Sequence, residues 1–480
     1  MQRPNVVLIM CDQLRADALA CYGGTFVQTP HMNRIAAQGV AYERAYSRTP
    51  VCVPARYGLM SGKAPFQLGL TDNHAGQKTI RNPLPALLKE RGYAAYAVGK
   101  MHFSPVRAHY GFDRMLLSEE IPEHWADDDY LQFLKRQGRL DVSEPHGKRS
   151  DSYYVPQTSE LPEELHTSAW TAEQTCRMIR DNRDRPFFIF ASFIKPHPPF
   201  DPCTPYDRMY DPATVPMPIR DDAEREPIDL SVEVQNDYKV GGADKLSDDE
   251  IRRIRAAYYG SVTQTDTQIG RILAQLEALN LRENTLVILT ADHGEMLGDH
   301  HSFGKRTFYE ASNRIPLVLS WPAALPQGES RKQFAVLEDV YATILSAAGA
   351  SLPDGCAGVN LLPSSQDCEA ETRGEVYGEF GRGAMLKFMR RWEHYKYTYH
   401  TNGGLEALFD LRSDPDELRN IAFEHPELCA ESRSRLKEYY QRHDFTEAFE
   451  NGELKRFEHR KHEPRGFLNQ APRWGNTVFD

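Results

Sequence analysis

The sequence predicts an α/β protein: a three-layer α/β/α sandwich with a mostly parallel central sheet, followed by a small C-terminal α+β domain with an antiparallel sheet. Apolar runs rich in β-branched residues recur along the chain and alternate with helix-like segments, at residues 6–10, 94–99, 187–193, 285–291 and 316–321. Such runs are typical of strands buried on both faces, as in a parallel sheet covered by helices. Beyond about residue 370 the pattern changes to short strand-like pieces and one terminal helix, which predicts the antiparallel sheet.

The connecting segments complete this prediction. Residues 85–93 and 251–280 have helical periodicity, and the second segment fits either one long helix or two. Two segments rich in Pro, Asp, Glu and Ser, 140–165 and 200–250, lack periodicity and are expected to be surface excursions that shape a pocket. We therefore predict a catalytic domain over residues 1–370 and a C-terminal subdomain over 371–480. The last thirty residues are compatible with an arm that docks on a neighbouring subunit of a homo-oligomer.

Composition excludes several classes of function. The chain has 480 residues, 40% hydrophobic and 26% charged, with a net charge of −11, which argues against a nucleic-acid partner. No apolar stretch approaches the roughly 18 residues of a membrane span, and the N-terminus passes directly into a strand without a signal-peptide pattern. A cytoplasmic location is therefore expected. The eight cysteines are scattered without metal-like spacing, so most of them are expected to be reduced thiols.

Polar side chains follow four of the predicted strands where each strand ends. They are Asp12 and Gln13, Lys100 and His102, Lys195 and His197, and Asp292 and His293. A single Asp in such a place is more often a turn or helix cap, but the agreement between four strands favours one site at the carboxyl edge of the sheet. The carboxylates, the Gln13 amide and the His293 imidazole suit a hard divalent cation, with manganese or zinc also open. Lys100, His102, His197 and Lys305 would supply positive charge and proton transfer around a tetrahedral anion.

A cysteine at a predicted helix start is the other candidate for chemistry. In the stretch TPVCVPARYGLMSG, Pro54 suits a first helical turn and Gly62 a helix end, which predicts a short helix from about Val53. Cys52 would then lie where free amides favour an anion, with Arg56 one turn further on. The residues alone leave two interpretations open: a buried cysteine beside a surface arginine, or a thiolate nucleophile.

At this point the residues match a family. The run Cys52-Val53-Pro54-Ala55-Arg56 resembles the sulfatase signature Cys-x-Pro-Ser/Ala-Arg, in which the cysteine is oxidised after translation to formylglycine. Further similar blocks occur in the expected order over nearly the whole chain: NVVLIMCDQLRADALACYGG, GYAAYAVGKMHF, KPHPPF, TADHGEMLGDH with Gly304-Lys305, and LFDLRSDPDELRNIA. The resemblance implies an alkaline-phosphatase-like fold and a formylglycine-generating maturation enzyme as a partner.

The resemblance also implies a role for each residue. In this family one hydroxyl of the formylglycine hydrate attacks sulfur and expels the alcohol, and the second hydroxyl then loses its proton so that sulfate is eliminated. By position, the metal ligands are Asp12, Gln13, the modified Cys52, Asp292 and His293. Arg56 would steady the hydrate, Lys100 and Lys305 would neutralise the sulfuryl oxygens, His102 would be the base, and His197 with Lys305 would assist the leaving oxygen.

One position departs from the best-known family pattern. Many members have Asp-Asp where this chain has Asp12-Gln13, which removes one negative charge from the metal site. Choline sulfatases and phosphonate monoester hydrolases are similar to this chain in carrying Asp-Gln here. Calcium is the family default for the one divalent metal, and manganese is also compatible.

The substrate is less constrained than the reaction. Asn73 and His74, in the loop after the nucleophile helix, are candidates for contacts to the sulfate or its leaving group, although a turn explains them equally well. A small sulfated substrate, an organic or carbohydrate monoester, is the first expectation. Phosphonate monoester or phosphodiester hydrolysis on the same scaffold is the alternative. A sugar-sulfate binding protein that has lost catalysis would instead keep Cys52 as a thiol.

Overall fold

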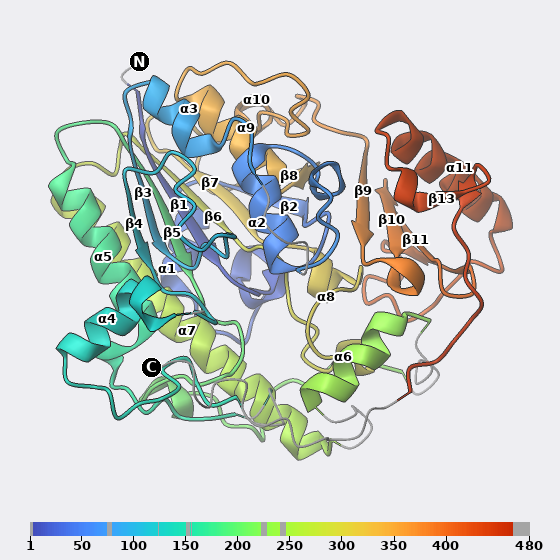
Figure 1. Ribbon diagram of the computed structural model, residues 1–480, viewed down its shortest axis with the longest axis horizontal. Helices are drawn as coiled ribbons and strands as arrows, with labels where there is room; N and C mark the ends of the chain where they lie inside the picture. The colour runs from blue at the N-terminus through green and yellow to red at the C-terminus, as the bar shows by residue number, and fades with distance from the viewer. Residues whose placement is uncertain are drawn as a thin grey trace.

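Two sheets organise the chain (Figure 1). The computed structural model describes residues 3–463 except 74–78, 123, 150–153, 155, 222–227 and 241–245. The strands of the large sheet are β1 (Asn5–Cys11), β2 (Val40–Tyr46), β3 (Ala94–Gly99), β4 (Arg114–Leu117), β5 (Phe187–Phe193), β6 (Thr285–Thr290), β7 (Leu317–Ser320) and β8 (Glu329–Val336). Its strand order is β4-β3-β5-β1-β6-β7-β2-β8.

The centre of the large sheet is parallel and fully buried. β1 pairs in parallel with both β5 and β6, and β5 pairs in parallel with β3. Every residue of these four strands is buried, as their unbroken apolar sequences require. Because the four strands run in one direction, their carboxyl ends meet at one edge of the sheet.

Helices cover both faces of this sheet (Figure 1). One layer contains α1 (Pro30–Ala37), α5 (Thr167–Asp181) and α7 (Asp248–Ala278). The other contains α2 (Cys52–Ser61), α3 (Leu84–Glu90), α9 (Glu338–Ala347) and α10 (Leu362–Gln366). Three shorter helices, α4 (Asp129–Arg136), α6 (Leu230–Val240) and α8 (Glu310–Asn313), lie in the long connections. The predicted three-layer sandwich is confirmed, and the predicted segment 251–280 forms one helix rather than two, which ends at Ala278.

The sequence prediction missed three strands of this sheet. β2 and β8 mix apolar with charged residues, and β4 has only four residues, so none of them has a continuous apolar run. β7 was predicted as a strand, but it runs antiparallel to both of its neighbours. An apolar run indicates burial and not direction, so its orientation depends on the connections around it.

The small sheet is antiparallel, as predicted. Its strands are β9 (Glu375–Phe380), β10 (Lys387–Trp392), β11 (Tyr395–His400) and β12 (Leu405–Asp410), in the order β12-β11-β10-β9. The helix α11 (Pro426–Arg442) packs on it around an aromatic core that includes Phe388 and Tyr440. Phe66, from the segment after α2, belongs to the same core and so joins the two sheets.

The described part of the predicted C-terminal arm contacts its own chain. The short ribbon of β13 (Phe449–Glu450) and β14 (Glu453–Leu454) precedes a bridge between Phe457 and Asn402. His462 then pairs with Asp237 on α6. Docking of the arm on a neighbouring subunit stays a prediction, and residues 464–480 lie outside the described residues. No helix in the described part of the chain is long and apolar enough to cross a membrane.

Candidate functional site

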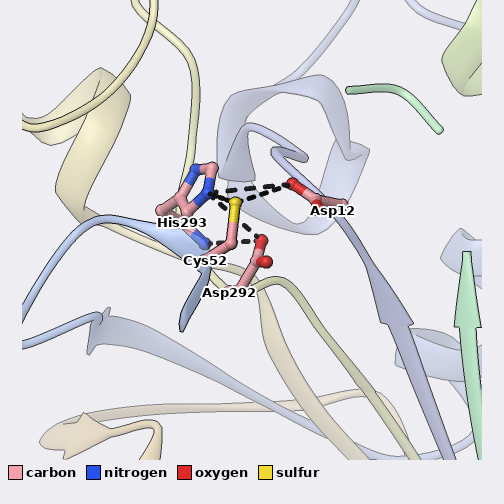
Figure 2. Close-up of side chains that lie close together, drawn as sticks. All are labelled: Asp12, Cys52, Asp292 and His293. Carbon is pink, nitrogen blue, oxygen red and sulfur yellow. Dashed lines mark hydrogen bonds and ion pairs between the residues drawn. The ribbon is translucent and has the colours of Figure 1, made fainter. Parts of the chain in front are cut away.

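The predicted strand-end residues meet at the carboxyl edge of the large sheet. β1 delivers Asp12, β3 delivers Lys100, and β6 delivers Asp292 and His293, while α2 brings Cys52 to the same place. Figure 2 shows the side chains of Asp12, Cys52, Asp292 and His293 converging from these separate segments. Their ligating atoms lie within 4.8 Å of one another, and all four side chains are buried.

The chemistry of this cluster fits a divalent cation. His293 Nε2 lies 3.7 Å from Asp12 Oδ1 and 3.6 Å from Asp292 Oδ1. Burial and the Cys52 thiol oppose ionisation of Asp12. The positive charges of Lys100, His197 and Lys305 outweigh both and lower the pKa of Asp12 to about 2. Burial and the adjacent Asp12 raise the pKa of Asp292. A cation between these two carboxylates would relieve their repulsion, and oxygen ligands with one imidazole suit calcium or manganese.

Gln13 is oriented by a carboxylate that the sequence analysis did not identify. Its side-chain amide donates hydrogen bonds to Glu295 and, over 3.1 Å, to the hydroxyl of Tyr154, which itself donates to Glu295 over 2.7 Å. Its oxygen, Oε1, accepts a hydrogen bond from Lys305 Nζ at 2.8 Å. The amide oxygen of Gln13 therefore faces the cluster. Gln13 lacks the carboxylate of the Asp that many family members have at this position, but the carboxyl group of Glu295 contacts the Gln13 side chain from behind.

Cys52 begins α2, as predicted, and Gly62 ends the helix in the left-handed conformation. The side-chain oxygen of Asn73 accepts a hydrogen bond from the backbone N–H of Val53 at 3.0 Å, so Asn73 lies beside the candidate nucleophile and caps its helix. The predicted substrate contact His74 lies outside the described residues.

Arg56 links the helix to the ends of the strands. Its guanidinium is fully buried and contacts both carboxylates, with Nε 2.9 Å from Asp292 Oδ2 and Nη2 3.3 Å from Asp12 Oδ2. It also donates to the carbonyl of Lys100 and to Ser192 Oγ, over 2.5 and 2.8 Å. Arg56 therefore joins α2 to the ends of four strands, β1, β3, β5 and β6, around Cys52, which excludes the interpretation of a surface arginine.

Two lysines face the Cys52 sulfur. Lys305 Nζ lies 3.2 Å from Sγ and Lys100 Nζ lies 3.9 Å from it. Burial raises the pKa of the Cys52 thiol, but Lys100 and Lys305, together with His293, outweigh burial and hold that pKa well below its ordinary value. The site is therefore built to stabilise negative charge at the position of Sγ.

The two candidate proton-transfer residues have different surroundings. His102 contributes to lowering the pKa of the Cys52 thiol, its ring nitrogen Nδ1 is buried without a hydrogen-bond partner in the described residues, and its backbone N–H donates to Glu119 over 3.0 Å. His197 Nδ1 lies 2.6 Å from the carbonyl of Pro198, and Nε2 lies 3.3 Å from Glu120 Oε2. Both ring nitrogens of His197 face acceptors, but burial outweighs the nearby carboxylate of Glu120 and lowers the pKa of the ring to about 3, so without a bound anion the imidazole is neutral.

Glu120 is a second carboxylate that the sequence analysis missed. Its Oε2 lies 2.8 Å from Lys100 Nζ, and its Oε1 lies 2.9 Å from Arg149 Nη1. Burial opposes its ionisation, but His197, Lys100 and Arg149 together hold the pKa of Glu120 well below its ordinary value. Lys195, which follows the same strand as His197, instead pairs with Asp201 and bonds to the Pro199 carbonyl, away from Cys52.

Comparison with known proteins agrees with this arrangement. A family model described as sulfatase matches residues 4–350, and a model described as N-sulphoglucosamine sulphohydrolase, C-terminal, matches residues 298–443. An arylsulfatase of Clostridium perfringens is 31% identical, over 87% of this chain and 90% of that protein.

Two further relatives are named for broader or different chemistry. A multifunctional alkaline phosphatase superfamily protein of Trinickia caryophylli is 29% identical, over 88% of this chain and 92% of that protein. The crystal structure of a phosphonate monoester hydrolase of Agrobacterium radiobacter superposes with a TM-score of 0.81 at 26% identity, covering 95% of this chain and 100% of that one. The predicted alkaline-phosphatase-like fold is thus confirmed.

Proposed function

The chain belongs to the sulfatase family and is a sulfuric ester hydrolase, and we propose that it cleaves a sulfate monoester of a small organic or carbohydrate alcohol through a formylglycine made from Cys52. The observation that carries this proposal is the pair of lysines against Sγ. Within the described residues, the hydrogen bonds of the Lys305 ammonium nitrogen, Nζ, go to the Gln13 amide oxygen and the Cys52 sulfur alone. Its charge is therefore available to a bound anion.

In this proposal the Cys52 sulfur occupies the place of a hydroxyl oxygen of the formylglycine hydrate. Asp12, Gln13, Asp292, His293 and the modified Cys52 would hold one divalent metal, calcium by preference, with manganese as the alternative. When bound, the metal supplies positive charge that favours a deprotonated hydroxyl and polarises a sulfuryl oxygen. A formylglycine-generating maturation enzyme is the partner that this proposal requires.

The chain's own residues would bind and orient the substrate. Lys100 and Lys305 approach the nucleophile position from two sides and would each bind a sulfuryl oxygen. Arg56 is fully engaged with Asp12 and Asp292, so it would position the nucleophile rather than bind substrate. Asn73 would support the start of α2 and thereby the nucleophile, with a contact to the sulfate as a further role.

Protons would move at two histidines. His102 lies close enough to Cys52 to lower the pKa of its thiol, and its buried Nδ1 has no hydrogen-bond partner in the described residues, so it would take the proton of the second hydroxyl when sulfate is eliminated. His197 faces Pro198 and Glu120, and the negative charge of a bound substrate would favour its protonated form, which would give the leaving oxygen a proton from Nε2, with Lys305 nearby to neutralise charge.

Phosphonate monoester or phosphodiester hydrolysis is the second candidate function. It is favoured by Gln13, which leaves the metal site one charge less negative, and by the likeness to a solved phosphonate monoester hydrolase. Both reactions place a tetrahedral anion against the same lysines and histidines.

One preparation tests both candidates. Mass spectrometry of the tryptic peptide that contains Cys52 first establishes formylglycine, and initial rates on phenyl sulfate and on phenyl methylphosphonate then follow. We expect sulfate hydrolysis to be the faster reaction. A preference for the phosphonate by more than about tenfold, or roughly 1.4 kcal/mol of barrier, would favour the second candidate, and an unmodified thiol in active protein would exclude the formylglycine mechanism.

A further inference from the structure

A pocket lies beside the catalytic edge, and the mechanism does not use it. It is formed by α4, the turn before α4 and the segment 139–149, and we call it the α4 pocket. Its walls include the apolar side chains of Trp125, Leu134, Leu140 and Val142. The cavity volume is about 60 Å³, room for about four to six water-sized groups, which is the size of one small ring.

The α4 pocket adjoins the catalytic residues through one shared side chain. Glu120 lines the pocket and contacts both Lys100, at 2.8 Å, and His197, at 3.3 Å. Lys100 in turn lies 3.9 Å from Cys52 Sγ. His197 is the proposed donor to the leaving oxygen, so Glu120 places the pocket next to the leaving-group side of the site.

An unpartnered buried histidine lines the same pocket. His146 is only 5% exposed, and neither of its ring nitrogens has a hydrogen-bond partner within the part of the chain that the structure describes. Burial and the charge of Lys195 hold its pKa well below the ordinary value, so the ring is neutral and offers one donor and one acceptor. A buried polar group without partners is costly, and a ligand hydroxyl in the pocket would satisfy it.

The mouth of the pocket is apolar and open. Leu140 is 53% exposed, although its side chain is part of the pocket wall. An apolar group that covered Leu140 would remove this surface from water, which is favourable in proportion to the area covered. The pocket therefore combines apolar walls, an unpartnered histidine and, through Glu120, contact with residues around the site of bond cleavage. Arg139, Ser143, Glu144 and Arg149 add polar groups to its lining.

We propose that the α4 pocket receives the leaving group of the substrate, and that this leaving group is an aromatic ring bearing a hydroxyl that hydrogen-bonds to His146. The inference rests on the proposed function, because it places the alcohol half of the ester that Lys100 and Lys305 would hold by its sulfate. It favours a hydroxyaryl sulfate over the carbohydrate esters, since a sugar ring would bring several hydroxyls against Trp125, Leu134 and Val142 without partners for them.

Kinetics on four esters test this proposal with the formylglycine-bearing, metal-loaded protein. The esters are methyl sulfate, phenyl sulfate and the monosulfates of resorcinol and hydroquinone. Each variant is compared with the wild type on the same ester, so that differences in intrinsic reactivity cancel. We expect Leu140→Asp to lower kcat/KM for the three aryl esters about fivefold or more and to leave methyl sulfate unchanged. Leu352→Asp, at another partly exposed leucine (38%) outside the pocket, is the matched control and should change none of them.

The histidine is tested separately. His146→Ala should lower kcat/KM for the better of the two hydroxylated esters about tenfold while changing phenyl sulfate less than twofold, and His146→Gln, which keeps a donor and an acceptor, should restore part of the loss. Equal effects of Leu140→Asp or His146→Ala on all four esters, or no effect on any, would overturn the inference.

A binding measurement separates this inference from the proposed function. Resorcinol titrated into the unreacted protein should bind with an affinity that falls in His146→Ala and not in Leu352→Asp, whether or not any sulfate is hydrolysed. Binding without hydrolysis of any sulfate ester would support the pocket and contradict the proposed function. Hydrolysis of phenyl sulfate without His146-dependent binding would leave the proposed function standing and overturn the pocket's assignment.

Discussion

Lys305 at the edge of the large sheet and Lys396 in the small sheet are both buried, yet their surroundings are opposite. Lys396 Nζ donates to the Phe308 carbonyl at 2.7 Å and pairs with Glu310 and Glu417 at 2.6 and 2.8 Å. Lys305 Nζ contacts an amide oxygen and the Cys52 sulfur. A buried cation balanced by carboxylates stabilises the fold around it, whereas one that faces neutral atoms and a nucleophile is held ready for an anion.

The largest expected effect is on kcat and comes from removal of the Cys52 side chain. Cys52→Ala should lower kcat by about 10³-fold or more, because no other described side chain occupies the nucleophile position. The matched control is Cys429→Ala, a buried thiol in the core of the small sheet, which should leave kcat/KM within about twofold and lower the free energy of unfolding by roughly 1 kcal/mol. Steady-state kinetics and urea unfolding measure the two. A Cys52→Ala enzyme with substantial activity would contradict the proposed nucleophile.

Replacing the two lysines by methionine tests the comparison directly. Lys305→Met should lower kcat/KM about 10²- to 10³-fold with little loss of stability, because no buried carboxylate loses its only partner. Lys396→Met should lower the free energy of unfolding by roughly 3 to 5 kcal/mol, because Glu310 and Glu417 stay buried without their cation, and should leave kcat/KM of the folded enzyme unchanged. The reverse pattern, with Lys305 important for stability and Lys396 for activity, would refute the distinction.

Loss of the contact that orients the Gln13 side chain is expected to have a smaller effect, on the affinity for calcium. Glu295→Gln removes the charged acceptor that fixes which way the Gln13 amide points, so affinity for calcium should fall about tenfold to a hundredfold. Calorimetric titration of the apoprotein measures this without reference to activity. Tyr154→Phe removes one weaker donor contact to the same carboxylate and should reduce affinity less. Unchanged calcium affinity in Glu295→Gln would show that the amide needs no such support.

The smallest expected effect on catalysis concerns a buried carboxyl group in β9 of the small sheet, which should instead affect stability. Glu379 accepts hydrogen bonds from Thr49 and Tyr440, and burial raises its pKa to about 8 from an ordinary value of 4.5. Between these values the folded chain keeps a proton that the unfolded chain has released, so this group lowers the free energy of unfolding as pH rises from about 5 to about 8.

The variant Glu379→Gln has no such proton. Between pH 5 and pH 8, the free energy of unfolding of this variant should therefore rise relative to that of the wild type by roughly 3 to 4 kcal/mol. Urea unfolding of both proteins at several pH values measures the difference, in which titration of all other groups cancels. A difference that is constant with pH would show that Glu379 is ionised in the folded protein throughout this range.

Local sequence predicted most of the catalytic edge. Asp12, Lys100 and Asp292 could be identified because each follows an apolar run, and the carboxyl ends of parallel strands meet at one edge whatever the connections between them. The start and end of α2 were predictable for a similar reason, since Pro54 and Gly62 act through backbone geometry that needs no tertiary contact.

The residues that support the site could not be predicted in the same way. Glu120 follows β4, which is too short to form a recognisable run, and Tyr154 lies in a long connection without periodicity. Their roles depend on distances to Lys100 and to Glu295 across elements remote in sequence. The α4 pocket is of the same kind, because its walls come from one helix, a turn and a loop.

By itself the sequence determined which residues stand at strand ends and that Cys52 begins a helix. Both features depend on residues that are adjacent in the chain: apolar runs mark buried strands, and Pro and Gly fix the backbone at helix ends. Tertiary structure alone decided that β7 is antiparallel, that Lys305 faces Cys52 while Lys396 faces two glutamates, and that His146 closes an apolar pocket. These outcomes follow from side chains that are brought together only when the chain is packed, and charge and hydrogen bonding then give similar residues different functions.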